Sequence, residues 1–153
     1  MKLFAELALT STGWEKNVRV AIDENGRITA VESEVEATSE DQQLRGRILL
    51  PALANLHSHA FQRAMAGLTE RRLTGRDSFW SWRELMYRFL ERLTPERIEA
   101  IAALVFMEML ERGYASVGEF HYVHHQVGGT HHDHIAETSL RAIAAAQQTG
   151  IGL

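Results

Sequence analysis

Two histidines separated by one residue, His57 and His59, follow an apolar run at residues 48–50. In a β-strand, alternate side chains point the same way, so two imidazoles in this pattern can bind one metal ion together. The ordinary alternative for an isolated His-x-His is a pair of surface histidines near a turn. The apolar approach favours a metal site at the mouth of an enclosed sheet, with His57 and His59 as ligands.

Two polar residues in the arginine-rich segment that follows, Gln62 and Arg83, are candidates for binding a substrate beside such a metal. A planar guanidinium can bind both oxygens of a carboxylate, so Arg83 suits a carboxylate-bearing substrate. The alternative is that most arginines here are solvated. For the aromatic residues Phe79, Trp80 and Trp82 we expect simple packing on the domain.

A second histidine-rich stretch, residues 124–134, holds five of the eight histidines in the chain. Such density favours metal binding, but a functional site needs fixed geometry. The Gly128-Gly129 centre and the irregular spacing indicate a surface loop. We therefore expect adventitious metal affinity here rather than a functional site.

The elements that must position these residues begin with a β-rich segment, residues 1–47, in which Asn25-Gly26 marks a two-residue hairpin turn. A nearly continuous apolar strand is predicted over residues 47–55. Such a strand is typical of a parallel sheet covered on both faces, and it would place His57 and His59 at its carboxyl end, where active sites gather. The domains predicted from this pattern are residues 1–47 and 48–153.

Three helices and a second strand follow. Asp77 or Ser78 is the predicted cap of a helix containing Phe79 to Leu93, and Thr94-Pro95 starts a helix that ends at Gly113. A strand over residues 114–123 comes next, and then a helix over residues 135–148, which Asp133 caps and Gly150 closes. Residues 151–153 resemble the start of another strand. The order strand, helix, strand predicts a parallel βαβ unit.

Composition limits the class of protein. The chain has 153 residues, 45% hydrophobic and 24% charged, with a net charge of −4 and no cysteine. These values are typical of a globular protein with no basic surface for nucleic acid, and any metal must use histidine and carboxylate ligands. The longest apolar run, residues 100–107, is too short to cross a membrane. We expect a cytoplasmic protein with no membrane or nucleic-acid partner, and self-association is left open.

Three segments, NLHSHAFQRAMAGLTE, DSFWSWRELMYRFLERLTPE and GYASVGEFHYVHH, resemble the formiminoglutamate deiminase family of the amidohydrolase superfamily. The resemblance implies an α/β fold: a metal-dependent (β/α)8 TIM-like barrel, flanked by a small β-sandwich. It also implies hydrolysis of N-formimino-L-glutamate to N-formyl-L-glutamate and ammonia, in histidine degradation. It assigns one zinc ion to His57 and His59, and substrate binding to Gln62, Arg83 and Tyr122.

The same resemblance makes this chain the N-terminal portion of the family's barrel, with about two βα units where a complete barrel has eight. Two further zinc ligands and all catalytic proton-transfer residues are expected on later strands, so the isolated chain is expected to be inactive. One departure is Ala52, where the family motif has glycine; it matters if that position needs a positive φ. Two alternatives stay open: another deaminase of the superfamily, such as a nucleobase deaminase, and a truncated product without activity.

Overall fold

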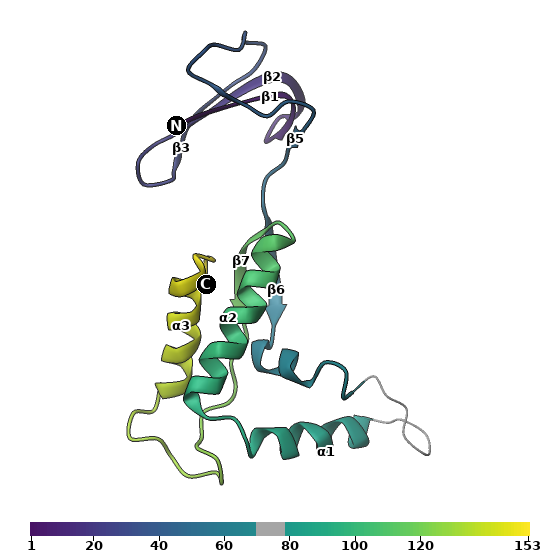
Figure 1. Ribbon diagram of the computed structural model, residues 1–153, viewed down its shortest axis with the longest axis vertical. Coiled ribbons are helices and arrows are strands. Elements are labelled where there is room, and N and C mark those ends of the chain that lie inside the picture. Colours follow the sequence, from purple (N-terminus) through teal and green to yellow (C-terminus); the bar gives the residue numbers. More distant parts are fainter. Residues whose placement is uncertain (70–78) are drawn as a thin grey trace. The chain divides into compact units, whose positions relative to one another are not determined.

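The computed structural model describes residues 1–69 and 79–153, which form two compact units, Met1–Pro51 and Ala52–Leu153 (Figure 1). The sequence predicts a boundary after residue 47, and the first compact unit extends to Pro51. The reason is that Ile48 and Leu49 form a short strand that pairs with the first strand of the chain. The apolar residues before the histidine pair therefore belong to the first unit.

The first unit is a sheet of five strands in the order β3-β2-β1-β4, with β5 also paired to β1. β1 and β2 are antiparallel, and β4 and β5 run parallel to β1. Ala8, Val18 and Val20 form the buried centre of this sheet. The hairpin at Gly26 is confirmed, although its loop covers residues 23–27 and is longer than the two-residue turn predicted. The strands are β1 (Lys2–Thr10), β2 (Gly13–Ile22), β3 (Ile28–Glu32), β4 (Gln42–Gln43) and β5 (Ile48–Leu49).

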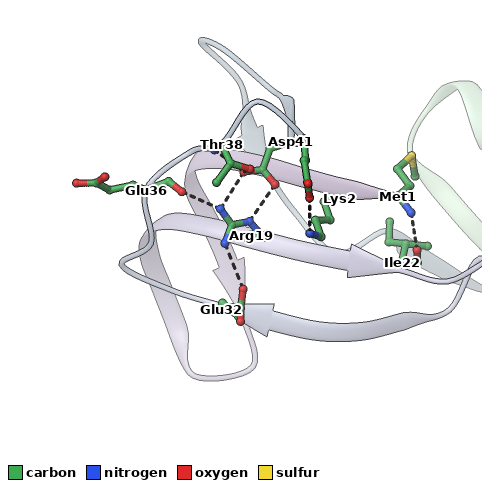
Figure 2. A network of polar contacts seen from close by, with 9 residues as sticks. Met1, Lys2, Arg19, Ile22, Glu32, Glu36, Thr38 and Asp41 are labelled. Atoms are coloured by element: carbon green, nitrogen blue, oxygen red, sulfur yellow. Dashed lines mark hydrogen bonds and ion pairs between the residues drawn. The ribbon is translucent and has the colours of Figure 1, made fainter.

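One buried ion pair holds the connection between β3 and β4 in this unit (Figure 2). Arg19 on β2 donates two hydrogen bonds of 2.9 Å to the two carboxylate oxygens of Asp41. Asp41 also accepts bonds from the backbone N–H and the hydroxyl of Thr38, and Arg19 reaches the carbonyl oxygen of Glu36. The Arg19 guanidinium, and then the Thr38 backbone N–H, hold the pKa of the buried Asp41 carboxyl far below its usual range.

The second unit contains a parallel βαβ unit, as predicted. β6 and β7 pair in parallel, and α2 lies between them in sequence. Ser116 on β7 also forms a parallel bridge with Gly152, so a third strand begins after α3, as predicted. The elements are β6 (Leu53–Ser58), the 3-10 helix η1 (Ala60–Met65), α1 (Phe79–Leu90), α2 (Pro95–Glu111), β7 (Tyr114–Glu119) and α3 (Glu137–Thr149).

Two predicted strands have different limits in the structure. The prediction of a single strand over residues 47–55 is wrong, because β5 and β6 are separate strands. They are divided around Pro51, which has no N–H for a sheet ladder. The second strand ends at Glu119 instead of residue 123. Ala52 has no positive φ, so its difference from the family's glycine requires no strained backbone.

The predicted helix ends are confirmed in three places. Thr94 caps α2 by accepting a bond from the Arg97 N–H, and Gly113 and Gly150 follow α2 and α3 with φ values of 88° and 83°. The predicted cap of α3 at Asp133 is wrong, because the cap position is Ala136 and makes no side-chain bond. The predicted cap of α1 at Asp77 or Ser78 lies outside the described residues.

The core of the second unit has two parts. One joins α2, β7 and α3 around the fully buried Phe106. The other joins η1 to the end of α1 and the start of α2, through Phe61, Met65 and Met86. Trp82 packs against this second part, as expected, but Phe79 and Trp80 are 62% and 64% exposed, so the prediction that they pack is wrong. Within residues 1–69 and 79–153, no helix is long and apolar enough to cross a membrane.

Candidate metal centre

The two histidines of the His-x-His pair converge at the carboxyl end of β6. The Nε2 atoms of His57 and His59 lie 3.0 Å apart, and their rings meet edge to face with centroids 4.8 Å apart. Two imidazole nitrogens bound at tetrahedral angles to one zinc ion are separated by about 3.3 Å. The predicted convergence of this pair is therefore present in the structure, in a geometry close to the one that a shared ion requires.

Contacts from Phe120, just after β7, and from Asn55 on β6 hold the His59 ring and the His57 backbone. The Nδ1 atom of His59 lies 3.0 Å from the carbonyl oxygen of Phe120, which can only accept a hydrogen bond. Nδ1 therefore carries the hydrogen and Nε2 carries a lone pair, which is the tautomer a metal ligand needs. In this structure that lone pair accepts the hydrogen bond from Nε2 of His57. The backbone N–H of His57 donates to the side-chain oxygen of Asn55 at 3.1 Å. No motif in the sequence marks Phe120 or Asn55 for these contacts.

A partly buried carboxylate supports the turn that follows the pair. Glu119 Oε1 accepts a 2.7 Å bond from the backbone N–H of Ala60, the first residue of η1. Its other oxygen, Oε2, is buried and has no hydrogen-bond partner in the described part of the chain. The sequence placed Glu119 on the second strand without a function, because a lone glutamate in a strand carries no motif.

Gln62 and Tyr122 are brought together beside His57 and His59, the candidate metal pair. Gln62 on η1 donates a 2.7 Å bond to the Tyr122 hydroxyl. The Tyr122 ring meets the His59 ring edge to face at a centroid distance of 5.1 Å. Met86 on α1 lies 3.9 Å from the same hydroxyl, measured at its sulfur. The side chains therefore form a continuous series from His57 and His59 through Tyr122 to Gln62.

Arg83 is held separately on α1. Its guanidinium lies against the rings of Trp80 and Tyr87, at 5.5 and 5.1 Å from their centroids. Nε and Nη2 both donate to the Tyr87 hydroxyl, at 3.1 and 2.9 Å. Within the described part of the chain, these interactions all stay on α1, so the structure does not bring Arg83 into contact with Gln62 or Tyr122.

A cavity of about 390 Å³ borders these residues, although Gln62, Arg83 and the two histidines of the pair do not line it. Tyr87 and Tyr122 both line it, so the hydroxyl that binds Arg83 and the one that binds Gln62 belong to residues facing the same space. The histidine-rich loop provides its remaining wall with His124, His125 and neighbouring residues. Each group therefore reaches this space through a tyrosine alone.

His121 does not take part in the candidate site. Its Nε2 atom contacts the carbonyl oxygen of Val123 and the hydroxyl of Thr138 on α3. Burial lowers its pKa, with opposing effects from the Val123 carbonyl and Glu119. His121 and Tyr122 lie beyond the end of β7 and contact different elements, and of the two only Tyr122 lies against His59.

The second histidine-rich stretch forms a hairpin. His125 and His131 are bridge partners, and the backbone N–H of Gln126 donates to the carbonyl oxygen of Thr130. In residues 1–69 and 79–153, no three histidine, aspartate or glutamate side chains converge as a metal-binding group. The expectation of adventitious affinity in this hairpin stays a prediction. The His57 and His59 pair would supply two of the three protein ligands usual in catalytic zinc sites.

Comparisons with known proteins agree along the chain. Residues 2–44 match the model of the formimidoylglutamate deiminase HutF, N-terminal domain, and residues 48–153 match that of the Amidohydrolase family. The formimidoylglutamate deiminase of Pseudomonas aeruginosa is 50% identical over 151 residues, which cover 99% of this chain and 33% of that protein. The 8-oxoguanine deaminase of the same organism is 30% identical over 79 residues, 50% of this chain and 16% of that protein.

Solved structures show the same relation. An amidohydrolase from Brucella melitensis superposes with a TM-score of 0.91 and 46% identity, over 99% of this chain and 33% of that one. Atrazine chlorohydrolase TrzN from Arthrobacter aurescens, complexed with zinc, superposes with a TM-score of 0.67 and 19% identity, over 97% of this chain and 34% of that one. The second is a likeness of fold alone. The chain spans about one third of the length of the relatives that it matches along nearly its whole length.

Proposed function

Since the chain belongs to the amidohydrolase family and has the α/β fold of that superfamily, we propose that it provides the first part of a formiminoglutamate deiminase. Formimino and formimidoyl name the same group, so this is the activity in the name of the Pseudomonas aeruginosa relative. The proposed reaction hydrolyses N-formimino-L-glutamate to N-formyl-L-glutamate and ammonia. The parallel pairing of β6, β7 and residue Gly152 supports the start of a (β/α)8 barrel, with the first unit as part of a flanking β-sandwich.

His57 and His59 are the proposed ligands of one divalent ion, with zinc as the expected metal. Support comes from the 3.0 Å separation of their Nε2 atoms and from the Phe120 carbonyl, which selects the ligand tautomer of His59. Such an ion, when bound, lowers the pKa of a water molecule and polarises the carbon–nitrogen group under attack. The chain's own contribution is to hold the two imidazoles in a fixed orientation before the ion arrives.

Gln62 and Tyr122 are the proposed groups that orient the substrate next to the metal. Their 2.7 Å hydrogen bond fixes both side chains, so the remaining donor hydrogens point in defined directions. Arg83 is the proposed partner of a substrate carboxylate. Its Nε and Nη2 are held by Tyr87, which leaves Nη1 able to donate to a carboxylate oxygen. The proposed substrate is a small molecule. Tyr122 and Tyr87, the bonding partners of Gln62 and Arg83, both line a neighbouring cavity, although Gln62 and Arg83 do not.

The convergence of His57 and His59 beside the Gln62–Tyr122 bond is the observation that carries this proposal. The test is ammonia release from N-formimino-L-glutamate by the full-length protein, with His57→Ala and Arg83→Ala. We expect His57→Ala to lose bound metal and activity. We expect Arg83→Ala to keep its metal and to raise KM more than it lowers kcat, because uniform substrate binding is lost.

Metal-dependent activity retained at wild-type level in both variants contradicts the assigned roles. The same assay with guanine and cytosine tests the substrate class. A preference for either nucleobase overturns the proposed substrate, because Arg83 is then without a carboxylate to bind. The cytoplasmic location expected from the sequence stays a prediction.

A further inference from the structure

The Glu119 side chain is a partly buried carboxylate, with one oxygen fully buried, for which the proposed function has no use. It lies at the end of β7, where Glu119 is the register partner of Ser58, the residue between the two histidines of the pair. One of its oxygens binds the Ala60 N–H, and the other is buried without a partner in the described part of the chain. Half-satisfied buried carboxylates are costly and rare, so this one requires an explanation.

Three hydrogen bonds from Glu119, the last residue of β7, and from Phe120, which follows it, hold residues 58–60. The Phe120 N–H donates to the Ser58 carbonyl oxygen at 2.8 Å, and the Phe120 carbonyl oxygen accepts from His59 at 3.0 Å. The third is the 2.7 Å bond from the Ala60 N–H to Glu119. Phe120 makes its two bonds with backbone atoms, whereas Glu119 uses its side chain. The Glu119 bond can therefore be removed by substituting Glu119.

The Glu119 bond acts where β6 changes into η1. Ala60 is the first residue of η1, and His59, in the cap position, offers no side-chain bond to the helix. A free N–H at this place would leave the turn after His59 held by the backbone alone. A charged acceptor gives a shorter and stronger hydrogen bond than a neutral one, which agrees with the 2.7 Å distance.

We propose that Glu119 is a positioning residue for the metal pair: its carboxylate fixes the Ala60 backbone so that the His57 and His59 Nε2 atoms stay convergent. This inference rests on the proposed metal role of the two histidines. In this role Glu119 does not bind the ion itself and acts through the Ala60 backbone. Substitutions of such supporting residues typically lower metal affinity by about 10- to 100-fold.

The experiment uses the full-length protein and three substitutions of Glu119 that separate reach from charge. Glu119→Gln keeps an oxygen at the same distance, Glu119→Asp keeps the charge but shortens the side chain, and Glu119→Ala removes both. Glu111→Ala, an exposed glutamate at the end of α2, is the matched control. The measurements are zinc affinity by chelator competition, the visible spectrum of the cobalt-substituted site, and hydrogen exchange of the Ala60 N–H without metal.

We expect Glu119→Ala and Glu119→Asp to lose about 10- to 100-fold in zinc affinity. Both should also alter the cobalt spectrum and expose the Ala60 N–H to exchange. Glu119→Gln should restore all three properties toward wild type, and Glu111→Ala should change none. If Glu119→Ala does not fold, the Asp and Gln variants alone decide between reach and charge. Wild-type affinity in Glu119→Asp, or an Ala60 N–H still protected in it, overturns the inference.

His57→Ala and His59→Ala are measured beside these variants. If neither weakens zinc binding, the proposed metal pair is wrong, while Ala60 exchange still reports on the Glu119 contact. If both abolish zinc binding and the Glu119 variants bind zinc as wild type does, the metal pair stands and the positioning role fails.

Discussion

The hydroxyl of Tyr122 connects the metal pair to the polar residues beside it. It accepts the Gln62 hydrogen bond, and the ring that carries it rests against His59. Tyr122→Phe removes the hydroxyl and keeps the ring, so it separates substrate orientation from support of the metal ligand. Loss of about 1 to 1.5 kcal/mol of hydrogen bonding should raise KM by about tenfold and leave metal content unchanged.

Steady-state kinetics and metal analysis of the full-length protein check this prediction. Tyr114→Phe makes the same chemical change at the start of β7 and should leave KM at its wild-type value. Combining Tyr122→Phe with Gln62→Ala should cost less than the sum of the single changes, because both remove the same bond. Unchanged KM in Tyr122→Phe, or loss of its metal, contradicts the assigned role.

At the residue scale, the sequence predicts the pair His57 and His59 from spacing, because the period of two in a strand fixes which side chains meet. The contact of Gln62 with Tyr122 depends on two segments 60 positions apart in the sequence, which spacing cannot join. The sequence does not indicate the bond of Glu119 either, because its partner Ala60 contributes only a backbone N–H. No side-chain pattern marks a bond of that kind.

Among the elements, the turn between α2 and β7 depends on one glycine. Gly113 has a φ of 88°, and its carbonyl oxygen accepts the Leu53 N–H at the start of β6. A Cβ at this position meets no atom within 4 Å, so an alanine would be disfavoured only by its left-handed backbone conformation. Gly113→Ala should therefore destabilise the chain by about 1 to 2 kcal/mol.

Gly118→Ala is the matched control, because Gly118 lacks a positive φ and its Cβ would be 3.7 Å from the nearest atoms of Leu56. We expect it to change the free energy of unfolding by less than about 1 kcal/mol. Urea unfolding followed by circular dichroism measures both. Equal stability of the two variants would show that the left-handed conformation of Gly113 does not limit the fold.

Local chemistry explains which element ends the sequence predicts. Thr94, Gly113 and Gly150 act within one turn of the helices that they cap, so their residue types are sufficient to predict these helix ends. The apolar run before His57 misleads because tertiary pairing divides it: Ile48 and Leu49 pair with β1, and β6 begins beyond Pro51. The exposure of Phe79 and Trp80 likewise depends on tertiary packing, which helical spacing does not determine.

At the scale of the whole molecule, the two units are stabilised by different means. The second unit has an apolar core around Phe106 and a second cluster around Met65. The first has the smaller buried centre of Ala8, Val18 and Val20, together with the Arg19–Asp41 ion pair. The sequence indicates the β-strands of the first unit, but it does not identify this ion pair, because Arg19 and Asp41 lie 22 residues apart in a segment rich in charges.

The buried ion pair predicts an acid-sensitive first unit. Asp41 has a pKa far below its ordinary value of about 3.9 because Arg19 and the Thr38 N–H stabilise its charge. A lowered folded-state pKa contributes stability above the unfolded-state pKa, and that contribution is lost as the pH falls toward the folded-state value. Below about pH 4 the first unit should therefore lose stability progressively.

Asp41→Asn tests this dependence, since it keeps the size of the side chain and removes its charge. At neutral pH we expect a lower Tm, because the largely buried Arg19 loses the carboxylate charge of Asp41 and keeps only the more distant Glu32 as an anionic partner. Between about pH 5 and pH 2 we expect Tm to fall less steeply in the variant than in the wild type. Glu24→Gln, at the exposed turn between β2 and β3, should follow the wild-type curve. Parallel curves for Asp41→Asn and wild type across this range would contradict a role for Asp41 in the acid response.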